Sequence, residues 1–314
     1  MIVCPSCQNL INEENFHREY HSEGINKTYK LYICEKCDLG FWYPLEFVEE
    51  IYSTDLLNIG YTVRIDIIRE NPYPIYHPNH ILGLKHLKKS KDYLSGNKLL
   101  DIGCGTGMFL REAKKIGFDV YGVDLDKGAI TVAKDIFKIE NVMLSSFDNF
   151  FEYAKSEGLK FDVITFFEVI EHLTNLKKFL NQVRELLNDG GIVIGSTPDR
   201  NRFLADLTRL GSNNDFPPHH FIWFSKTSLI NLFKTHNFDL IEIRKFKRGF
   251  RELINDANYF FRYSYNTLVS KFKKSQQEKD PSRNLKRILS KEILFAYITE
   301  FFISTGMFFV FRKS

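Results

Sequence analysis

The chain has 314 residues, of which 44% are hydrophobic and 26% are charged, and its formal net charge at pH 7 is +4. This length allows two domains or one decorated domain, and the apolar content is ordinary for a globular protein with a sizeable core. The mild positive charge gives no reason to expect a nucleic-acid partner. The first residues show no basic leader followed by an apolar run, so we expect a cytoplasmic protein.

Four of the five cysteines form two C-x-x-C pairs, Cys4 with Cys7 and Cys34 with Cys37. Each pair places two thiolates on one tight turn, and two such turns close a tetrahedral zinc site. Because protein ligands would fill all four positions, the expected zinc is structural and supplies much of the folding energy of residues 1–45. A redox-active pair is the alternative, although that chemistry needs only one C-x-x-C beside a βαβ unit.

Residues 46–96 are expected to connect this region to the next one. The prolines of Asn71-Pro72-Tyr73-Pro74 break any helix, so a linker is predicted there. A helix is predicted over 80–93, where apolar residues recur at helical spacing.

A glycine-rich turn follows the apolar run 98–102, with glycine at 103, 105 and 107 and a helical pattern from 108 to 116. Glycine lets a backbone turn sharply and approach a ligand closely. A second predicted strand, 119–123, ends at Asp124, where an acid can accept both hydroxyls of a ribose. The G-x-G-x-G spacing differs from the G-x-G-x-x-G of dinucleotide sites, which leaves an NAD site as the weaker alternative.

Asp101, the three glycines and Asp124 together resemble motif I and the ribose-binding acid of class I methyltransferases, which use S-adenosylmethionine. The resemblance implies that Asp101 and the glycines hold the methionine end of the donor and that the helix at 80–93 helps to cover it. It also implies that Ser146 and Phe147 contact the adenine, with core packing as an equal alternative for Phe147. The full set of cofactor-binding residues that it implies is Asp101, Gly103, Cys104, Gly105, Gly107, Asp124, Leu125, Ser146, Phe147 and Glu168.

Strands alternate with helices beyond residue 97, which predicts a mostly parallel sheet covered by helices on both faces. We expect a doubly wound, seven-stranded, Rossmann-like α/β methyltransferase domain, whose last strand is antiparallel as the resemblance implies. This domain would comprise residues 97–248 and 305–314, interrupted by a helical insertion at 249–304. The predicted strands are 98–102, 119–123, 141–144, 161–166, 191–195, 238–245 and 306–313.

The fourth predicted strand leads into an E-x-x-E-H motif formed by Glu168, Glu171 and His172. If a helix begins there, the three side chains share one face. Three uses are open: capping the helix and orienting the donor, general-base catalysis by His172, or binding a divalent cation that lowers the pKa of an acceptor hydroxyl.

A second histidine cluster lies in the P-P-x-H-x-x-x-F-S pattern of residues 217–225, which resembles the acceptor-side loop of these methyltransferases. Ser225 is expected to cap a helix. Plant-type small-RNA 2′-O-methyltransferases have a similar E-x-x-E-H motif and a distant histidine that together hold magnesium, so magnesium is a further candidate cofactor, with His220 or His219 completing its site. Loop histidines packed in a proline-rich turn are the alternative. The catalytic candidates are Glu168, Glu171, His172 and His220.

Residues 249–304 combine basic and aromatic residues at helical spacing, and two amphipathic helices are expected there. These helices could rest on the inner face of an anionic membrane, or pack on the domain or on a second copy of the chain. The apolar stretch 293–311 is long enough to span a membrane, but Glu300 near its middle and the strand expected at 306–313 argue against spanning. The oligomeric state stays open.

The two C-x-x-C turns, the segment Phe41-Trp42-Tyr43-Pro44 and the glycine-rich turn together resemble a bacterial family of zinc-ribbon methyltransferases associated with surface polysaccharide or sugar modification. The resemblance implies methyl transfer from S-adenosylmethionine to a sugar or a glycan-linked acceptor. One alternative is a divalent-cation-assisted O-methyltransferase that acts on RNA or on a quinone-type small molecule. The other is a non-catalytic protein that binds S-adenosylmethionine.

Overall fold

A computed structural model of the chain describes residues 2–46, 77–202, 215–246 and 306–314, together with Ala205, Arg209 and Asn213. The predicted linker at 71–74 and the predicted insertion at 249–304 lie outside these residues, and so does any membrane contact of the insertion. Within the described ranges, no helix has both the length and the apolar composition that crossing a bilayer requires.

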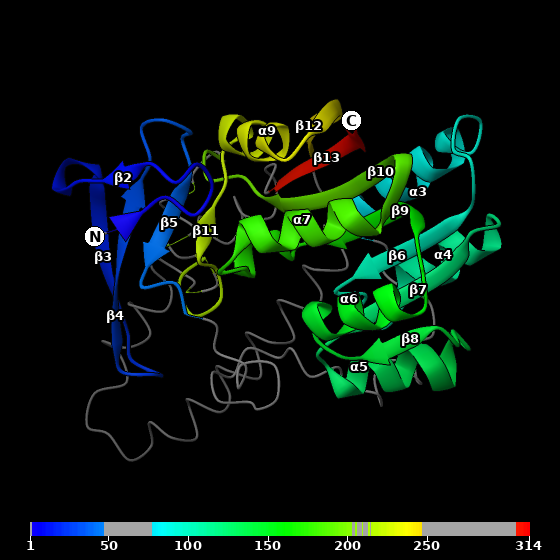
Figure 1. Ribbon diagram of the computed structural model, residues 1–314. Helices are drawn as coiled ribbons and strands as arrows, with labels where there is room; N and C mark the ends of the chain where they lie inside the picture. The colour runs from blue at the N-terminus through cyan, green and yellow to red at the C-terminus, as the bar shows by residue number, and fades with distance from the viewer. Residues whose placement is uncertain are drawn as a thin grey trace, which may run out of the picture.

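The central element is a seven-stranded sheet in the order β12-β13-β10-β9-β6-β7-β8, which confirms the predicted doubly wound fold (Figure 1). Strands β10, β9, β6, β7 and β8 run parallel, and β13 runs antiparallel between β10 and β12. The strands are β6 (Lys98–Ile102), β7 (Asp119–Asp124), β8 (Val142–Leu144), β9 (Phe161–Phe167), β10 (Leu187–Pro198), β12 (Phe238–Phe246) and β13 (Gly306–Lys313).

The strand order reverses next to β6. The chain builds the sheet outward through β7 to β8 and then returns to β9 on the other side of β6. Ligands of such sheets bind at this reversal, at the carboxyl ends of the strands. Strand β10 is longer than the predicted 191–195 because its pairing with β13 continues as far as Pro198 with Gly306. Ser196 and Thr197 are thereby brought to the edge where ligands bind.

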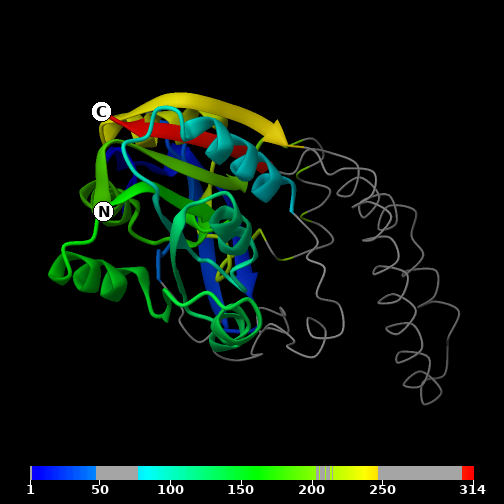
Figure 2. The ribbon, with the colours of Figure 1, turned by 90° about the vertical axis from the view of Figure 1, so that its right-hand side faces the viewer.

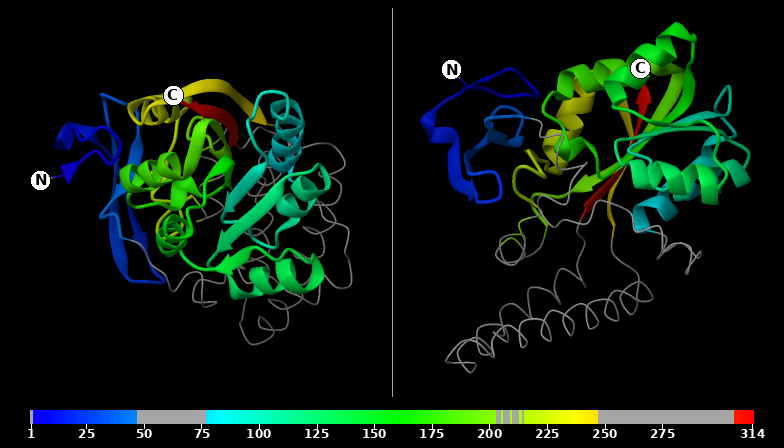
Figure 3. Two further views of the ribbon diagram at one scale, coloured as in Figure 1. Left: turned by 45° about the vertical axis from the view of Figure 1, so that its right-hand side comes forward. Right: turned by 90° about the horizontal axis from the view of Figure 1, so that it is seen from below.

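Two layers of helices cover the two faces of the sheet (Figure 2, Figure 3). Buried Leu87 and Phe109 place α3 and α4 in one apolar cluster, whereas buried Leu180 and Phe233 place α7 and α9 in the other. Ser225 accepts a hydrogen bond from the amide of Ser228, which confirms the predicted cap of α9. The helices are α3 (Pro78–Ser90), α4 (Met108–Lys115), α5 (Lys127–Thr131), α6 (Phe147–Ser156), α7 (Leu176–Leu186) and α9 (Lys226–Thr235).

Residues 2–46 form two small sheets, and one of them includes a strand from far along the chain (Figure 1). Strand β11 pairs antiparallel with β5, so the order of this sheet is β11-β5-β4-β3. The strands are β1 (Ile2–Val3), β2 (Leu10–Ile11), β3 (Phe16–Ser22), β4 (Lys27–Ile33), β5 (Gly40–Tyr43) and β11 (Ile222–Trp223).

Aromatic side chains join this N-terminal unit, residues 2–46, to the loop that carries the two adjacent histidines. The Trp42 ring lies edge-on to Trp223 with 5.4 Å between centroids, and the Tyr20 ring stacks on Phe216 at 4.5 Å. These rings belong to one continuous apolar cluster with α7 and α9. The N-terminal unit is therefore built onto the loop that carries His219 and His220, a connection that the sequence did not indicate.

Candidate functional site

The turn between β6 and α4, residues 103–107 and hereafter the donor turn, has a backbone conformation that glycine adopts readily. Gly103, Gly105 and Gly107 have φ angles of 71°, 51° and 75°. A Cβ atom on Gly103 would lie only 2.6 Å from Cγ2 of Val169, so the turn also packs on the segment that follows β9. The donor turn and the E-x-x-E-H motif are therefore neighbours at the carboxyl edge of the sheet.

Asp124 lies at the tip of β7 and bonds to the donor turn. Its Oδ2 accepts a 2.7 Å hydrogen bond from the amide of Gly105, and its Oδ1 accepts one of 2.8 Å from the amide of Asp126. Burial raises the pKa of this carboxyl. Each carboxylate oxygen has a second lone pair, so the group can still accept hydroxyl donors from a ribose. Asp124 thus lies at the end of the second strand and beside the glycine-rich turn, the position that the sequence predicted for it.

Asp101 precedes the donor turn and Cys104 is part of it, and both side chains are buried. The side chain of Asp101 accepts a 2.6 Å hydrogen bond from the hydroxyl of Thr165 on β9 and is 2% exposed. Burial raises the pKa of Asp101 to about 7. Cys104 is also buried, and a Cβ atom on Gly122 of β7 would lie 2.8 Å from its sulfur. Both side chains support the turn from inside the protein.

The residues expected at the adenine lie one strand further along the edge. Ser146 caps α6, because its Oγ accepts a 3.2 Å hydrogen bond from the amide of Asn149. The half-buried Phe147 ring packs edge-to-face on Phe179, with 5.2 Å between centroids. Leu125 is half-buried directly after β7. Phe147 therefore has the core contact that its sequence alternative described, and its partial exposure leaves one part of the ring outside the core.

The E-x-x-E-H motif does not begin a helix, so the expected shared helical face is wrong. Strand β9 stays paired with β10 as far as Phe167 with Ser196, and the chain then turns sharply at Glu168, whose φ is 55°. A 3₁₀ turn, η3 (Ile170–His172), follows. Glu168 instead accepts a 2.6 Å hydrogen bond from Ser196, which accepts one of 2.8 Å from Asn79 on α3. Glu168 is thereby tied to the sheet and to the helix expected to cover the donor.

The other two motif residues meet His220 in a buried group. One ligand atom from each of Glu171, His172 and His220 lies within 4.8 Å of the others. Glu171 is 1% exposed; its Oε2 accepts a 3.0 Å hydrogen bond from Thr197, whereas its Oε1 has no hydrogen-bond partner among the described residues. Burial, with a contribution from the charge of Glu168, raises the pKa of Glu171 well above its usual value. The predicted convergence of His220 with the motif is seen, but Glu168 is not part of this group.

Hydrogen bonds join η3 to the loop that carries His219 and His220. His172 contacts the carbonyl oxygen of His219 through Nδ1 at 2.7 Å, and the amide of Phe221 donates to the carbonyl oxygen of Glu171 at 2.9 Å. The rings of His172 and His220 lie 4.8 Å apart, edge to face. Burial lowers the pKa of His172 to about 3, so its imidazole is neutral at neutral pH. Because a carbonyl oxygen only accepts, Nδ1 of His172 carries a proton in this contact.

A cluster of charged residues borders His220. Asp215 accepts hydrogen bonds at Oδ2 from Arg202 at 2.6 Å and from Arg209 at 2.9 Å. Its Oδ1 lies 3.4 Å from Nδ1 of His220. A hollow with room for about one water molecule opens between these side chains and Trp223. Sequence reasoning did not select Asp215 or the arginines, because they belong to no motif and meet only through the loop.

A methyltransferase domain profile matches residues 82–243, just over half of the chain. The chain belongs to this methyltransferase family. The matched range contains the donor turn, Asp124, the E-x-x-E-H motif and the loop of His219 and His220.

Curated relatives of this methyltransferase share its central part. It is 33% identical over 135 residues to a ubiquinone biosynthesis O-methyltransferase of Paraburkholderia phymatum, covering 42% of the chain and 58% of the relative. A protein of the same name from Azorhizobium caulinodans is 35% identical over 115 residues, covering 37% of the chain and 46% of the relative. The chain thus spans about half the length of the curated relatives it matches.

Solved structures support the fold of the methyltransferase. A cyclopropane synthase of Mycobacterium tuberculosis superposes with a TM-score of 0.50 at 16% identity, covering 80% of the chain and 95% of that protein. At this identity the likeness shows the fold alone.

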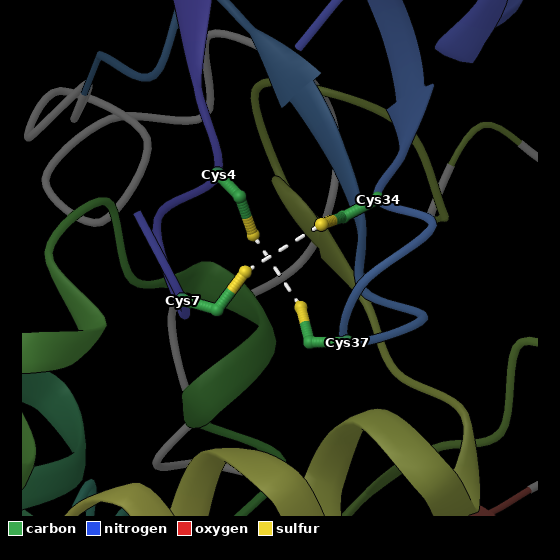
Figure 4. A group of neighbouring side chains, drawn as sticks. All are labelled: Cys4, Cys7, Cys34 and Cys37. Carbon is green, nitrogen blue, oxygen red and sulfur yellow. Dashed lines mark hydrogen bonds between the residues drawn. The ribbon is translucent and has the colours of Figure 1, made fainter. Parts of the chain in front are cut away.

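The four thiols of the N-terminal unit of this methyltransferase converge on one point (Figure 4). The sulfur atoms of Cys4 and Cys37 are 3.5 Å apart, and those of Cys7 and Cys34 are 3.6 Å apart. Thiolates around a tetrahedral zinc at about 2.3 Å are about 3.8 Å apart. None of the four is in a disulfide. The donor set and its spacing therefore fit a structural zinc ion, as the two C-x-x-C turns predicted.

Proposed function

We propose that the chain is an S-adenosylmethionine-dependent O-methyltransferase acting on a hydroxyl group of a small molecule. The observation that carries the proposal is the junction of two features at one edge of the sheet. One is the donor turn with Asp124, and the other is the buried group of Glu171, His172 and His220. They are joined because Gly103 packs on Val169, two residues before Glu171. A donor bound at the turn would lie next to groups able to take a proton from an acceptor.

The names of the curated relatives favour a small-molecule hydroxyl as the acceptor, because both are O-methyltransferases of ubiquinone biosynthesis. They give no support to the sugar or glycan acceptor that the zinc-ribbon resemblance implied, or to RNA. We therefore place the quinone-type alternative ahead of the sugar.

In the proposed reaction, the protein positions the donor and the acceptor hydroxyl and accepts the hydroxyl proton. When bound, S-adenosylmethionine supplies a methyl group already activated by its positive sulfur. The donor turn and Asp124 would hold the donor, and the residues at the adjacent edge would hold the acceptor hydroxyl in line with the methyl group. Because its pKa is about 3, His172 is a weak base, so His220 is our candidate for accepting the hydroxyl proton.

Transfer of labelled methyl from S-adenosylmethionine into fractionated cell extract tests the proposal, with the Asp124→Ala variant as the blank. Label in quinone-type or other small phenolic compounds is the expected result. Label confined to nucleotide-sugar, glycolipid or RNA fractions would replace the acceptor class. Absence of both label and donor binding would overturn the proposal as a whole.

A divalent cation at Glu171, His172 and His220 is a second element of the proposal. Two observations favour it: Oε1 of Glu171 is buried without a hydrogen-bond partner among the described residues, and one carboxylate oxygen of Glu171 lies within 4.8 Å of ring nitrogens of His172 and His220. A bound cation would compensate this buried carboxylate and lower the pKa of an acceptor hydroxyl. Two imidazoles and one carboxylate suit zinc, manganese or iron(II) better than the magnesium that the E-x-x-E-H resemblance implied, because magnesium prefers an all-oxygen shell.

We expect the zinc-loaded protein to bind one further equivalent of Mn²⁺ and the Glu171→Gln variant to bind it at least about tenfold more weakly. Isothermal titration calorimetry with Mn²⁺ measures this directly. The matched control is Glu168→Gln, which removes a carboxylate three residues earlier that bonds to Ser196, and it should change the Mn²⁺ affinity by less than about threefold. Absence of Mn²⁺ binding, or equal losses in both variants, would remove the cation from the proposed chemistry.

We further propose that zinc in the N-terminal unit holds the acceptor side in place. Asp38, the residue after Cys37, accepts a 2.6 Å hydrogen bond from Arg200 at Oδ1 and a further hydrogen bond from Ser225 at Oδ2. Its carbonyl oxygen accepts a second bond from Arg200 at 2.9 Å. The turn that carries the thiols is thus bonded to the chain just after β10 and to the start of α9.

A further inference from the structure

Asp215 lies in contact with Nδ1 of His220. The side chain of Asp215 is 12% exposed, and its Oδ1 lies 3.4 Å from Nδ1 of His220. The same imidazole packs edge to face with the His172 ring, with 4.8 Å between centroids. His220 is therefore held between a carboxylate and the buried group that we place at the reaction centre.

The position and charge of Asp215 are fixed by its neighbours. Burial alone would raise its pKa, but the contact with His220 and the charges of Arg202 and Arg209 outweigh burial and hold the pKa well below its usual range. The indole nitrogen of Trp223 donates a 2.6 Å hydrogen bond to the backbone oxygen of Asp215, and the Arg209 guanidinium stacks on the Trp223 ring at 3.7 Å. Asp215 is thus a firmly held carboxylate that is paired with two guanidinium groups.

A carboxylate accepts hydrogen bonds and cannot donate one, so the nitrogen that faces it must carry the proton. We propose that Asp215 is a positioning residue that holds His220 as the Nδ1–H tautomer and leaves Nε2 to face the reacting group. Either task proposed for His220, taking a hydroxyl proton or binding a cation, needs a ring nitrogen with a free lone pair. The tautomer of His220 follows from the contacts of Asp215 alone. The effect of that tautomer on methyl transfer rests on the proposed function.

His172 shows the same arrangement with a different partner. Its Nδ1 faces the carbonyl oxygen of His219, which also cannot donate. Both imidazoles therefore have an oxygen acceptor at Nδ1. The alternative is a purely structural role, in which Asp215 only neutralises Arg202 and Arg209 and His220 can take either tautomer.

The Asp215→Asn variant separates these two roles. Asparagine keeps the shape of the side chain, but its amide can donate to Nδ1 and so favours the opposite tautomer of His220. Imidazole ¹⁵N chemical shifts of histidine-labelled protein report the tautomer, and the His220 signals are assigned as those missing from His220→Asn. We expect the Nδ1–H form in the natural chain and the Nε2–H form, or a mixture, in Asp215→Asn. The Nε2–H form in the natural chain would overturn the proposal, even if the variant fails to fold.

Kinetics supply the second readout. We expect Asp215→Asn to lower kcat by about a hundredfold or more and to change the donor Kd by less than about threefold. The control is Asp199→Asn, which removes another buried carboxylate, paired with Lys245 at 2.7 Å, and should leave the His220 tautomer unchanged. An unchanged tautomer with kcat within about threefold in Asp215→Asn would show that Asp215 serves the arginines alone. The tautomer measurement needs no substrate, so failure of the proposed methyl transfer does not decide it.

Discussion

Replacing Asp124 with alanine is expected to weaken the binding of S-adenosylmethionine by at least about a hundredfold. Under the proposed function, the carboxylate accepts hydrogen bonds from two ribose hydroxyls, and a hydrogen bond to a charged group contributes about 1.5–3 kcal/mol. Two such bonds correspond to about a hundredfold or more in Kd. Alanine also removes the acceptor of the Gly105 and Asp126 amides, which shape the donor turn.

Calorimetric titration with S-adenosylmethionine measures this effect, and thermal unfolding shows whether the domain stays folded. Asp124→Asn is a graded variant, because the amide keeps one acceptor oxygen and loses the charge; its Kd should fall between those of the natural chain and the alanine variant. The matched control is Asp119→Asn at the opposite end of β7, which should leave the Kd within about threefold. An unchanged Kd in Asp124→Ala would show that the ribose lies elsewhere.

The features that the sequence predicted well are those in which a local pattern has one physical solution. Alternating strands and helices specify a parallel sheet, and glycine at 103, 105 and 107 is favoured because φ is positive there. Asp124 follows from the spacing of two adjacent strands, and the four cysteines follow from the two C-x-x-C turns. Each of these inferences needs only neighbours along the chain or on the next strand.

The features that the sequence did not predict depend on contacts between distant segments. A helical reading of the E-x-x-E-H motif placed Glu168 with Glu171, but the pairing of β9 with β10 forces a turn at Glu168 and directs it to Ser196. Asp215 acquires its role only because the loop folds back on η3, and no spacing rule links it to His172.

The domain boundary predicted near residue 45 also missed a contact between distant segments. Composition and cysteine spacing identify the N-terminal unit, but β11 has only two residues, too few for a strand pattern. Its pairing with β5 makes the segment after His219 and His220 part of the N-terminal sheet. A short edge strand contributed from a distant loop is visible only in three dimensions.

This shared sheet leads to the second large effect. The Cys34→Ser variant is expected to lose its zinc, to lose methyl transfer by at least about a hundredfold, and to keep its donor Kd within about threefold. Structural zinc contributes about 10–16 kcal/mol in small zinc-binding peptides, and the N-terminal unit has little core that does not depend on its partner loop. When β5 is lost, β11 loses its only strand partner in the described sheet. The loop of His219 and His220 then loses its support, whereas the donor turn lies on the central sheet and does not.

The two tryptophans of the chain make this prediction directly measurable. Trp42 and Trp223 are buried against each other at the β5–β11 contact, so tryptophan emission reports on this interface alone. We expect a red shift in Cys34→Ser, with metal analysis showing the loss of one zinc per chain.

The control is Cys104→Ala, the one cysteine outside the group, which should keep both the zinc and the emission of the natural chain. A zinc-free Cys34→Ser protein with unchanged emission would show that aromatic packing alone holds the N-terminal unit. If Cys34→Ser keeps its affinity for the donor but loses methyl transfer, zinc acts on the acceptor side. The donor turn would be unaffected because it shares no strand with the thiols.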